Sequence, residues 1–184
     1  MGKLKKMKHV LVAIISLFFV VSCAESKKEE SSQKKETKKV KTVKKVKVPK
    51  KAKMIIVDAD GVVNVSMITD DRMKFNLRKI TVKAGQKIKL TLTHKGKLNK
   101  KIMGHNVVFL NKGVKVSTFA SKASGAQASD YIPEGTTDVL AYTKLVGGGE
   151  TTTIEFTAPA AGTYDYICSF PAHYAMMKGK LIVQ

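Results

Sequence analysis

The residues with the clearest chemical potential lie between Cys168 and Met177, near the end of the 184-residue chain. This segment reads CSFPAHYAMM, so a thiol is followed by an imidazole five residues later and by thioethers eight and nine residues later. These groups bind soft or borderline metal ions, and a turn at Pro171 lets one loop present all of them to one point. Each residue also has a structural explanation, because cysteine and methionine suit an apolar core and His173 suits a surface.

A second imidazole stands upstream, in the tripeptide Gly104-His105-Asn106. Two imidazoles and a thiolate in one plane, with a weak axial methionine, form the ligand set of blue-copper electron-transfer sites. This set is a compromise between the geometries that Cu(II) and Cu(I) prefer, so electron gain or loss moves few atoms. Zinc is the main competing metal, but zinc sites favour a closed tetrahedral set, and a methionine ligand argues against zinc. The residues therefore predict one type 1 copper ion.

The segments that must position these ligands have the pattern of β-strands. Apolar and polar residues alternate with a period of two at 63–67, 87–94, 153–157 and 164–168. Between 75–77 and 80–82 the period slips by one residue, which predicts a β-bulge or a bend. Only 114–131, rich in alanine and serine, favours a short helix. We predict an all-β fold, a Greek-key β-sandwich with one short helical insertion.

The first 53 residues differ in composition from the rest of the chain. A lysine-rich start and the apolar run 10–21 predict a secretory signal, and the segment ending in Cys23 resembles the lipobox of bacterial lipoproteins. The alternatives are an ordinary cleaved signal and a short anchor helix. We predict a lipoprotein signal peptide at 1–22, a lipidated Cys23 with a lysine-rich disordered tether at 23–53, and a copper-binding domain at 54–184.

The charge and the cysteines support this division. The formal net charge is +20, and most of it precedes residue 54, so we interpret it as a solvated tether near an anionic envelope surface. Nucleic-acid binding is not expected, because no stacking aromatic residues lie among these lysines. If Cys23 carries lipid, Cys168 has no disulfide partner, and a lone thiol in an exported protein suits a metal ligand.

From about Val63 to the C-terminus the chain resembles the azurins, bacterial blue-copper proteins of the cupredoxin family. The matching stretches are 71–76 (DRMKFN), 101–106 (KIMGHN), 141–147 (AYTKLVG) and 168–179. The resemblance implies that His105 and His173 bind copper through Nδ1 and that Cys168 supplies the thiolate. It further implies Met177 as the distant axial sulfur and the Gly104 carbonyl as a weak contact on the opposite side.

The resemblance also implies supporting roles. Asn106 should join the two ligand loops, and the backbone N–H groups of Asn106 and Phe170 should point at the Cys168 sulfur. His94 matches a histidine that azurins bury near the copper without ligating it, with either a structural or a pH-sensing role. Redox partners would dock on an apolar surface around His173 formed by Met73, Leu98, Met103, Phe170, Pro171, Ala172 and Met176. The disulfide usual in azurins is missing, and the chain has no tryptophan.

The expected function is a one-electron shuttle between redox proteins of a bacterial envelope, such as cytochromes, reductases or oxidases. The carrier would be a monomer in the periplasm or outer cell envelope, bound to a membrane by the lipid on Cys23. An enzyme is not expected, because copper enzymes with cupredoxin domains need a second, histidine-rich centre and residues 54–184 contain three histidines. Periplasmic copper binding and delivery is the alternative function.

Overall fold

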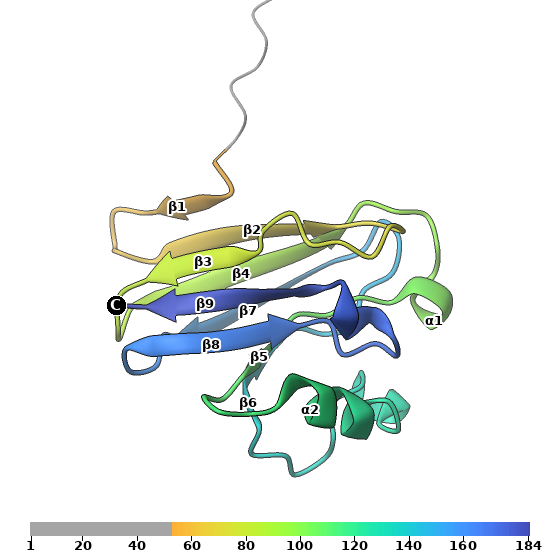
Figure 1. The fold of residues 1–184 in the computed structure, drawn as a ribbon. Helices are drawn as coiled ribbons and strands as arrows, with labels where there is room; N and C mark the ends of the chain where they lie inside the picture. The colour runs from red at the N-terminus through yellow and green to blue at the C-terminus, as the bar shows by residue number, and fades with distance from the viewer. Residues whose placement is uncertain (1–52) are drawn as a thin grey trace, which may run out of the picture. The chain divides into compact units, whose positions relative to one another are not determined.

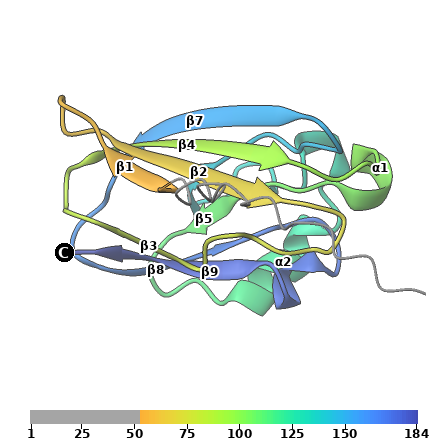
Figure 2. The ribbon, with the colours of Figure 1, turned by 90° about the horizontal axis from the view of Figure 1, so that it is seen from above.

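The computed structural model describes residues 53–184, which contain two β-sheets on opposite sides of an apolar core (Figures 1 and 2). The predicted signal peptide, the lipidation site Cys23 and nearly all of the tether lie outside these residues. Within 53–184, no helix has the length and apolar character needed to cross a bilayer.

The first sheet has the strand order β1-β2-β4-β7. Its strands are β1 (Ile55–Val57), β2 (Val63–Thr69), β4 (Lys87–His94) and β7 (Thr151–Thr157). β2 and β4 are parallel, and the other pairs are antiparallel. The alternation predicted for 87–94 is confirmed, since Ile88, Leu90, Leu92 and His94 are all fully buried. A register slip of one residue would turn the intervening lysines and threonines into the core, so this pattern fixes where His94 lies.

The second sheet has the order β3-β9-β8-β5-β6. Its strands are β3 (Lys79–Val82), β9 (Lys178–Val183), β8 (Gly162–Ile167), β5 (Val108–Leu110) and β6 (Val139–Tyr142). The period slip predicted before residue 80 is a bend, because residues 70–78 leave the first sheet and lead into β3 of the second. A register irregularity between Phe109 and Leu110 was not predicted.

Four short helical segments connect the strands: α1 (Lys100–Met103), α2 (Val116–Ala123), η1 (Gln127–Ser129) and η2 (His173–Ala175). The predicted insertion at 114–131 is confirmed as α2 and η1. α2 buries Phe119, Ala120 and Ala123 in a cluster with Leu110 and Ile167, so it covers the second sheet. α1 was not predicted, and it begins after Asn99, whose side chain accepts a hydrogen bond from the Lys101 N–H.

The main core fills the space between the sheets and continues into the predicted metal site. Met67, Leu90, Leu92, Phe109 and Tyr166 are fully buried, and Cys168 and Met177 belong to the same cluster. Burying one such large apolar side chain stabilises a fold by about 1.5–3 kcal/mol. The core therefore supplies the rigidity of the ligand residues, because they are packed into it.

Candidate metal centre

Three of the predicted ligands meet at one end of the sandwich. The ligand atoms of His105, Cys168 and His173 all lie within 4.8 Å of one another. Each imidazole presents its Nδ1 to the thiol, at 3.8 Å from the Cys168 Sγ. All three residues are buried, the most exposed being His173 at 4%. Figure 1 shows the loop from β8 to β9 and helix α1 at this end, opposite the C-terminus.

The spacing of the three atoms fits a bound metal ion. Metal–nitrogen bonds of about 2.0–2.1 Å and metal–sulfur bonds of about 2.3 Å hold the nitrogen and the sulfur roughly 3.5–3.8 Å apart at angles of about 110–120°. The observed separations of 3.8 Å match that range. Two imidazole nitrogens and one sulfur are also the donor types that copper accepts in electron-transfer sites.

His105 is fixed by its neighbours in sequence and in space. Its backbone pairs with Val146 through two hydrogen bonds of 2.9 Å. Its Nε2 lies 3.1 Å from the Asp70 carbonyl oxygen. A carbonyl can only accept, so Nε2 carries the proton and Nδ1 keeps a free electron pair directed at the site.

Gly104 is required at its position by close packing. A Cβ there would lie 2.5 Å from the Lys100 carbonyl oxygen and within 3 Å of the Leu145 side chain. The backbone can therefore approach the site, and the Gly104 carbonyl oxygen lies 3.9 Å from the Cys168 Sγ.

Cys168 and His173 are held by the loop that follows β8. The Cys168 N–H donates to the Met177 carbonyl at 3.0 Å, and the Met177 N–H donates to the His173 carbonyl at 2.8 Å. The predicted turn is present, with Ala172 in a left-handed conformation at φ 67°. These bonds close the ten-residue loop upon itself, so its ligands keep fixed positions.

The two adjacent methionines of this loop have opposite environments. Met177 is fully buried in the cluster that contains Cys168, whereas Met176 is 47% exposed. Sequence spacing alone left either methionine able to reach the metal.

Asn106 joins the two ligand loops. Its side-chain oxygen accepts from the Ser169 N–H at 2.8 Å, and its amide donates to the Ser169 hydroxyl at 2.8 Å and to the Asp130 carbonyl at 2.9 Å. Ser169 was missed by the sequence analysis, as was Thr143, whose hydroxyl accepts from the Val107 N–H. The position of Ser169 beside Cys168 and of Thr143 in the 141–147 stretch was the available signal.

Burial keeps the ligand groups uncharged when no metal is bound. Desolvation raises the pKa of the Cys168 thiol to about 12, and the backbone N–H groups of Asn106 and Phe170 oppose that rise by donating to the sulfur. Desolvation also lowers the pKa of His105 and of His173 to about 4. A buried thiolate thus needs a positive partner, and a metal ion supplies one.

His94 lies against the site with both ring nitrogens occupied. Its ring stacks on His105 with centroids 4.6 Å apart. Its Nδ1 accepts from the Gly96 N–H at 3.0 Å, and its Nε2 lies 3.0 Å from the Met103 carbonyl oxygen, to which it donates. These partners specify a neutral imidazole, and they leave His94 no free nitrogen for a metal.

Two aromatic rings, Phe170 and Tyr131, support the His173 imidazole. The ring centroids of Phe170 and His173 are 4.6 Å apart, and the Tyr131 ring packs edge-on against Phe170 with centroids 5.0 Å apart. Tyr131 is 6% exposed and, like Asp130 before it, has a positive φ. Its role was not predicted, because no pattern in the sequence indicates that the insertion returns to the ligand loop.

The residues predicted for partner docking come from three segments at the ligand end. Leu98, Ala172 and Met176 are exposed, while Met73, Met103, Phe170 and Pro171 are half-buried. Ile102, which the sequence analysis omitted, is 60% exposed between the predicted residues Leu98 and Met103.

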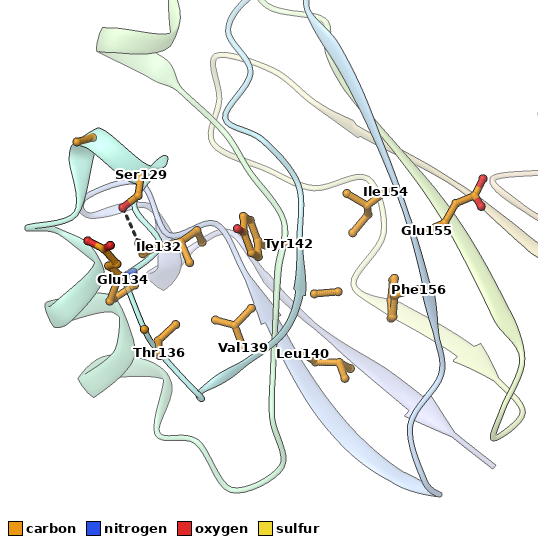
Figure 3. Close-up of a pocket in the computed structure, with 14 residues that line it drawn as sticks. Ser129, Ile132, Glu134, Thr136, Val139, Leu140, Tyr142, Ile154, Glu155 and Phe156 are labelled. Carbon is orange, nitrogen blue, oxygen red and sulfur yellow. Dashed lines mark hydrogen bonds between the residues drawn. The ribbon is translucent and has the colours of Figure 1, made fainter.

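A separate cleft of about 830 Å³ lies between strands β6 and β7, the edge strands of the two sheets. Figure 3 shows Ile154 and Phe156 on β7 and Val139, Leu140 and Tyr142 on β6 around it. None of the three clustered metal-ligand residues lines it. This cleft is therefore separate from the buried cluster of His105, Cys168 and His173.

Comparison with known proteins assigns the chain to a family. The sequence profile of copper-binding proteins of the plastocyanin/azurin family matches residues 61–184. The chain belongs to the plastocyanin/azurin family. The expected resemblance to azurins is thereby confirmed, together with the two-sheet β fold and copper as the cofactor.

Individual relatives agree with this placement. The chain is 40% identical over 117 residues to azurin-2 of Alcaligenes xylosoxydans xylosoxydans, a match that covers 61% of this chain and 91% of that protein. It is 37% identical over 115 residues to auracyanin-A of Chloroflexus aurantiacus, a match that covers 61% of this chain and 68% of that protein. The solved structure of auracyanin A, a "blue" copper protein from that organism, superposes with a TM-score of 0.62 at 32% identity, covering 67% of this chain and all of that one.

Proposed function

We propose that this protein is a type 1 copper electron carrier that shuttles single electrons between redox proteins of a bacterial envelope. The observation that carries the proposal is the buried cluster of His105, Cys168 and His173, with both Nδ1 atoms 3.8 Å from the sulfur. When bound, copper would supply the Cu(I)/Cu(II) couple.

The chain's own residues would keep the ligand positions constant in both oxidation states. His105 is held by Val146 and Asp70, and the loop carrying Cys168 and His173 is closed by hydrogen bonds and joined to Asn106. Ligands that are held in this way need not rearrange when the charge of the site changes. A small reorganisation is what a fast electron carrier requires.

We propose that Met177 would also hold the copper through its sulfur and that the Gly104 carbonyl would add a weak contact. Full burial of Met177 and exposure of Met176 support the first assignment. The second is supported by the 3.9 Å between the Gly104 oxygen and the Cys168 Sγ. The N–H groups of Asn106 and Phe170 would stabilise thiolate charge on Cys168.

An enzyme is disfavoured by the distribution of ligands. Residues 53–184 contain one cluster of three metal-binding side chains, and His94, the remaining histidine there, uses both nitrogens in backbone hydrogen bonds. Copper delivery is the second candidate function. It would suit an exposed and exchangeable site, whereas Cys168 and His105 are fully buried here.

Visible absorption and voltammetry of the copper-loaded protein test the proposal. We expect an intense thiolate-to-copper charge-transfer band and a reversible one-electron couple, and Cys168→Ser should lose both. A colourless protein that passes Cu(I) to an acceptor would support delivery instead. A couple unchanged in Cys168→Ser would contradict the ligand assignment.

We further propose that the carrier is monomeric and bound to an envelope membrane through lipid on Cys23. The lipobox-like segment before Cys23 and the thirteen lysines between Ala24 and Lys53 support the attachment to a membrane. Cys23→Ser should move the protein from the membrane fraction to the soluble fraction after cell disruption. An unchanged membrane fraction would count against the lipid.

A further inference from the structure

The distribution of charge around the ligand end is strongly one-sided. Between Asp71 and Asp130 the sequence contains no aspartate or glutamate, yet it contains fourteen lysines and arginines. Four of these are Lys95, Lys97, Lys100 and Lys101, which surround and begin helix α1. Lys144 adds a fifth charge from the segment that leads to Val146. We call these five exposed residues the lysine rim.

The lysine rim lies on backbone that adjoins the metal centre. The Gly148 N–H donates to the Leu98 carbonyl at 2.8 Å, so the α1 segment packs on the loop carrying Lys144. Lys100 and Lys144 line one surface cleft together with Val146, whose backbone pairs with His105. Figure 1 shows α1 at the same end as the β8–β9 loop.

The charges of the lysine rim are not neutralised within the described residues. In residues 53–184 the salt bridges of lysine or arginine involve Arg72, Lys89, Lys122 and Lys180, and none involves the rim. Asp70 also lies at this end, where its carbonyl meets His105, and its carboxylate pairs with Arg72. Two further carboxylates lie nearby, and both accept backbone hydrogen bonds. Asp71 accepts from Lys97 and Leu98, and Glu150 accepts from Gly147. Five lysines against two carboxylates leave a positive surface.

Exposed apolar side chains lie at the same end as the lysine rim. Leu98 is 39% exposed, Ile102 60% and Met176 47%. An apolar centre with a charged periphery is the usual anatomy of a protein–protein interface, in which the apolar part gives close contact and the charges steer the encounter.

We propose that the lysine rim recruits an acidic redox protein to the ligand end, a proposal that rests on the electron-carrier function. A partner with a carboxylate-rich surface around its own redox centre would complement the rim. Attraction of this kind raises association rates by about 10- to 1000-fold at low ionic strength. An anionic membrane is the weaker candidate, because it would cover the surface through which electrons must pass.

A pair of charge-reversal variants tests the proposal. Lys100→Glu/Lys101→Glu reverses two rim charges in the first turn of α1, where acidic residues suit a helix. Lys83→Glu/Lys87→Glu is the matched control with the same net charge. Both control lysines lie far from the metal centre. Lys83 precedes Ala84, whose N–H donates a hydrogen bond to the carbonyl of Gln184. Lys87 is the first residue of β4 and lies roughly 23 Å from His94, the last residue of that strand.

The measurement is the second-order rate constant of electron exchange between the copper-loaded protein in neutral detergent and an acidic soluble cytochrome. At about 10 mM salt we expect the rim variant to be about tenfold slower than the unmodified protein, and the control variant less than about twofold slower. A basic cytochrome should react faster with the rim variant than with the unmodified protein. The difference between variants should nearly vanish at about 300 mM salt, because screening shortens the range of charge interactions.

Several outcomes would overturn the proposal. Equal slowing by the two variants would show an effect of net charge alone. Loss of binding to phosphatidylglycerol vesicles in the rim variant, with unchanged exchange rates, would assign the rim to a membrane. The charge-transfer band and the reversible couple are recorded for every variant. Their absence in the unmodified protein would contradict the electron-carrier function itself, and the rim proposal would fail with it.

Discussion

At the scale of single residues, the metal-binding side chains are uncharged when no metal is bound. The pKa of Cys168 is raised to about 12 and the pKa values of His105 and His173 are lowered to about 4, mainly by burial. The thiol is then protonated and the imidazoles are not, over a wide pH range. Because the unfolded chain protonates these imidazoles near pH 6.5, acidification from there toward pH 4 should destabilise the metal-free fold.

Proton release on copper binding tests these pKa directions. At pH 5 we expect about one proton to be released per Cu(II), from Cys168 alone, because both imidazoles are already neutral. Ordinary pKa values would give about three protons at that pH. Calorimetry in buffers of different ionisation enthalpy measures the number. Cys168→Ser is the control and should release almost none.

Asn106 offers a second test at this scale. Asn106→Ala removes three hydrogen bonds and leaves the buried Ser169 N–H without its partner. We expect a loss of roughly 2–4 kcal/mol in the free energy of unfolding, since buried unpaired groups are costly. Ser169→Ala removes only the hydroxyl partner and should cost about 1 kcal/mol. Urea unfolding of the metal-free proteins compares the two, and equal losses would mean that Asn106 does not join the loops.

At the scale of elements, strand pairing places the ligand loop. β8 and β9 are antiparallel, with Tyr166 opposite Gly179, and the loop between these strands carries Cys168, His173 and Met177. The Tyr166 ring covers Gly179, and its hydroxyl donates to the Leu77 carbonyl at 2.9 Å. The register of two strands thus determines where the ligands project.

Gly179→Ala tests this dependence. An added Cβ would fall 2.2 Å from the Tyr166 ring, so the ring or the strand must move. We expect a loss of about 2–3 kcal/mol in unfolding free energy and weaker copper binding. Lys180→Ala on the same strand breaks only an exposed ion pair with Asp165 and should cost less than about 1 kcal/mol. Thermal unfolding and copper titration of both variants provide the comparison.

The sequence predicted the cluster of His105, Cys168 and His173 better than it predicted the residues that hold this cluster in place. Cys168 and His173 could be predicted as metal-binding residues because thiols and imidazoles are rare in this chain and their spacing is informative. Ser169 and Thr143 are common residue types that act on backbone groups from other loops, so no local pattern marks them. Strands with an alternating pattern, such as β4, were found. β5 was missed, because its three residues are all buried and show no alternation.

At the scale of the whole molecule, the fold and the metal share the task of stability. Residues 53–184 contain no disulfide, and their one cysteine is a predicted ligand. A continuous core from Met67 to Leu181 holds the two sheets together without any metal. The metal-free protein should therefore keep its fold, and copper should add stability in proportion to its affinity.

Thermal unfolding with and without copper tests this division. A ligand at a thousand times its Kd stabilises the folded state by about 4 kcal/mol. For a domain of this size that corresponds to a rise in Tm of roughly 10–15 °C. The metal-free protein should still unfold in one cooperative step, because its core is intact. Cys168→Ser should unfold near the metal-free temperature and gain little from copper. A metal-free protein without a cooperative transition would show that copper, and not the core, holds the two sheets together.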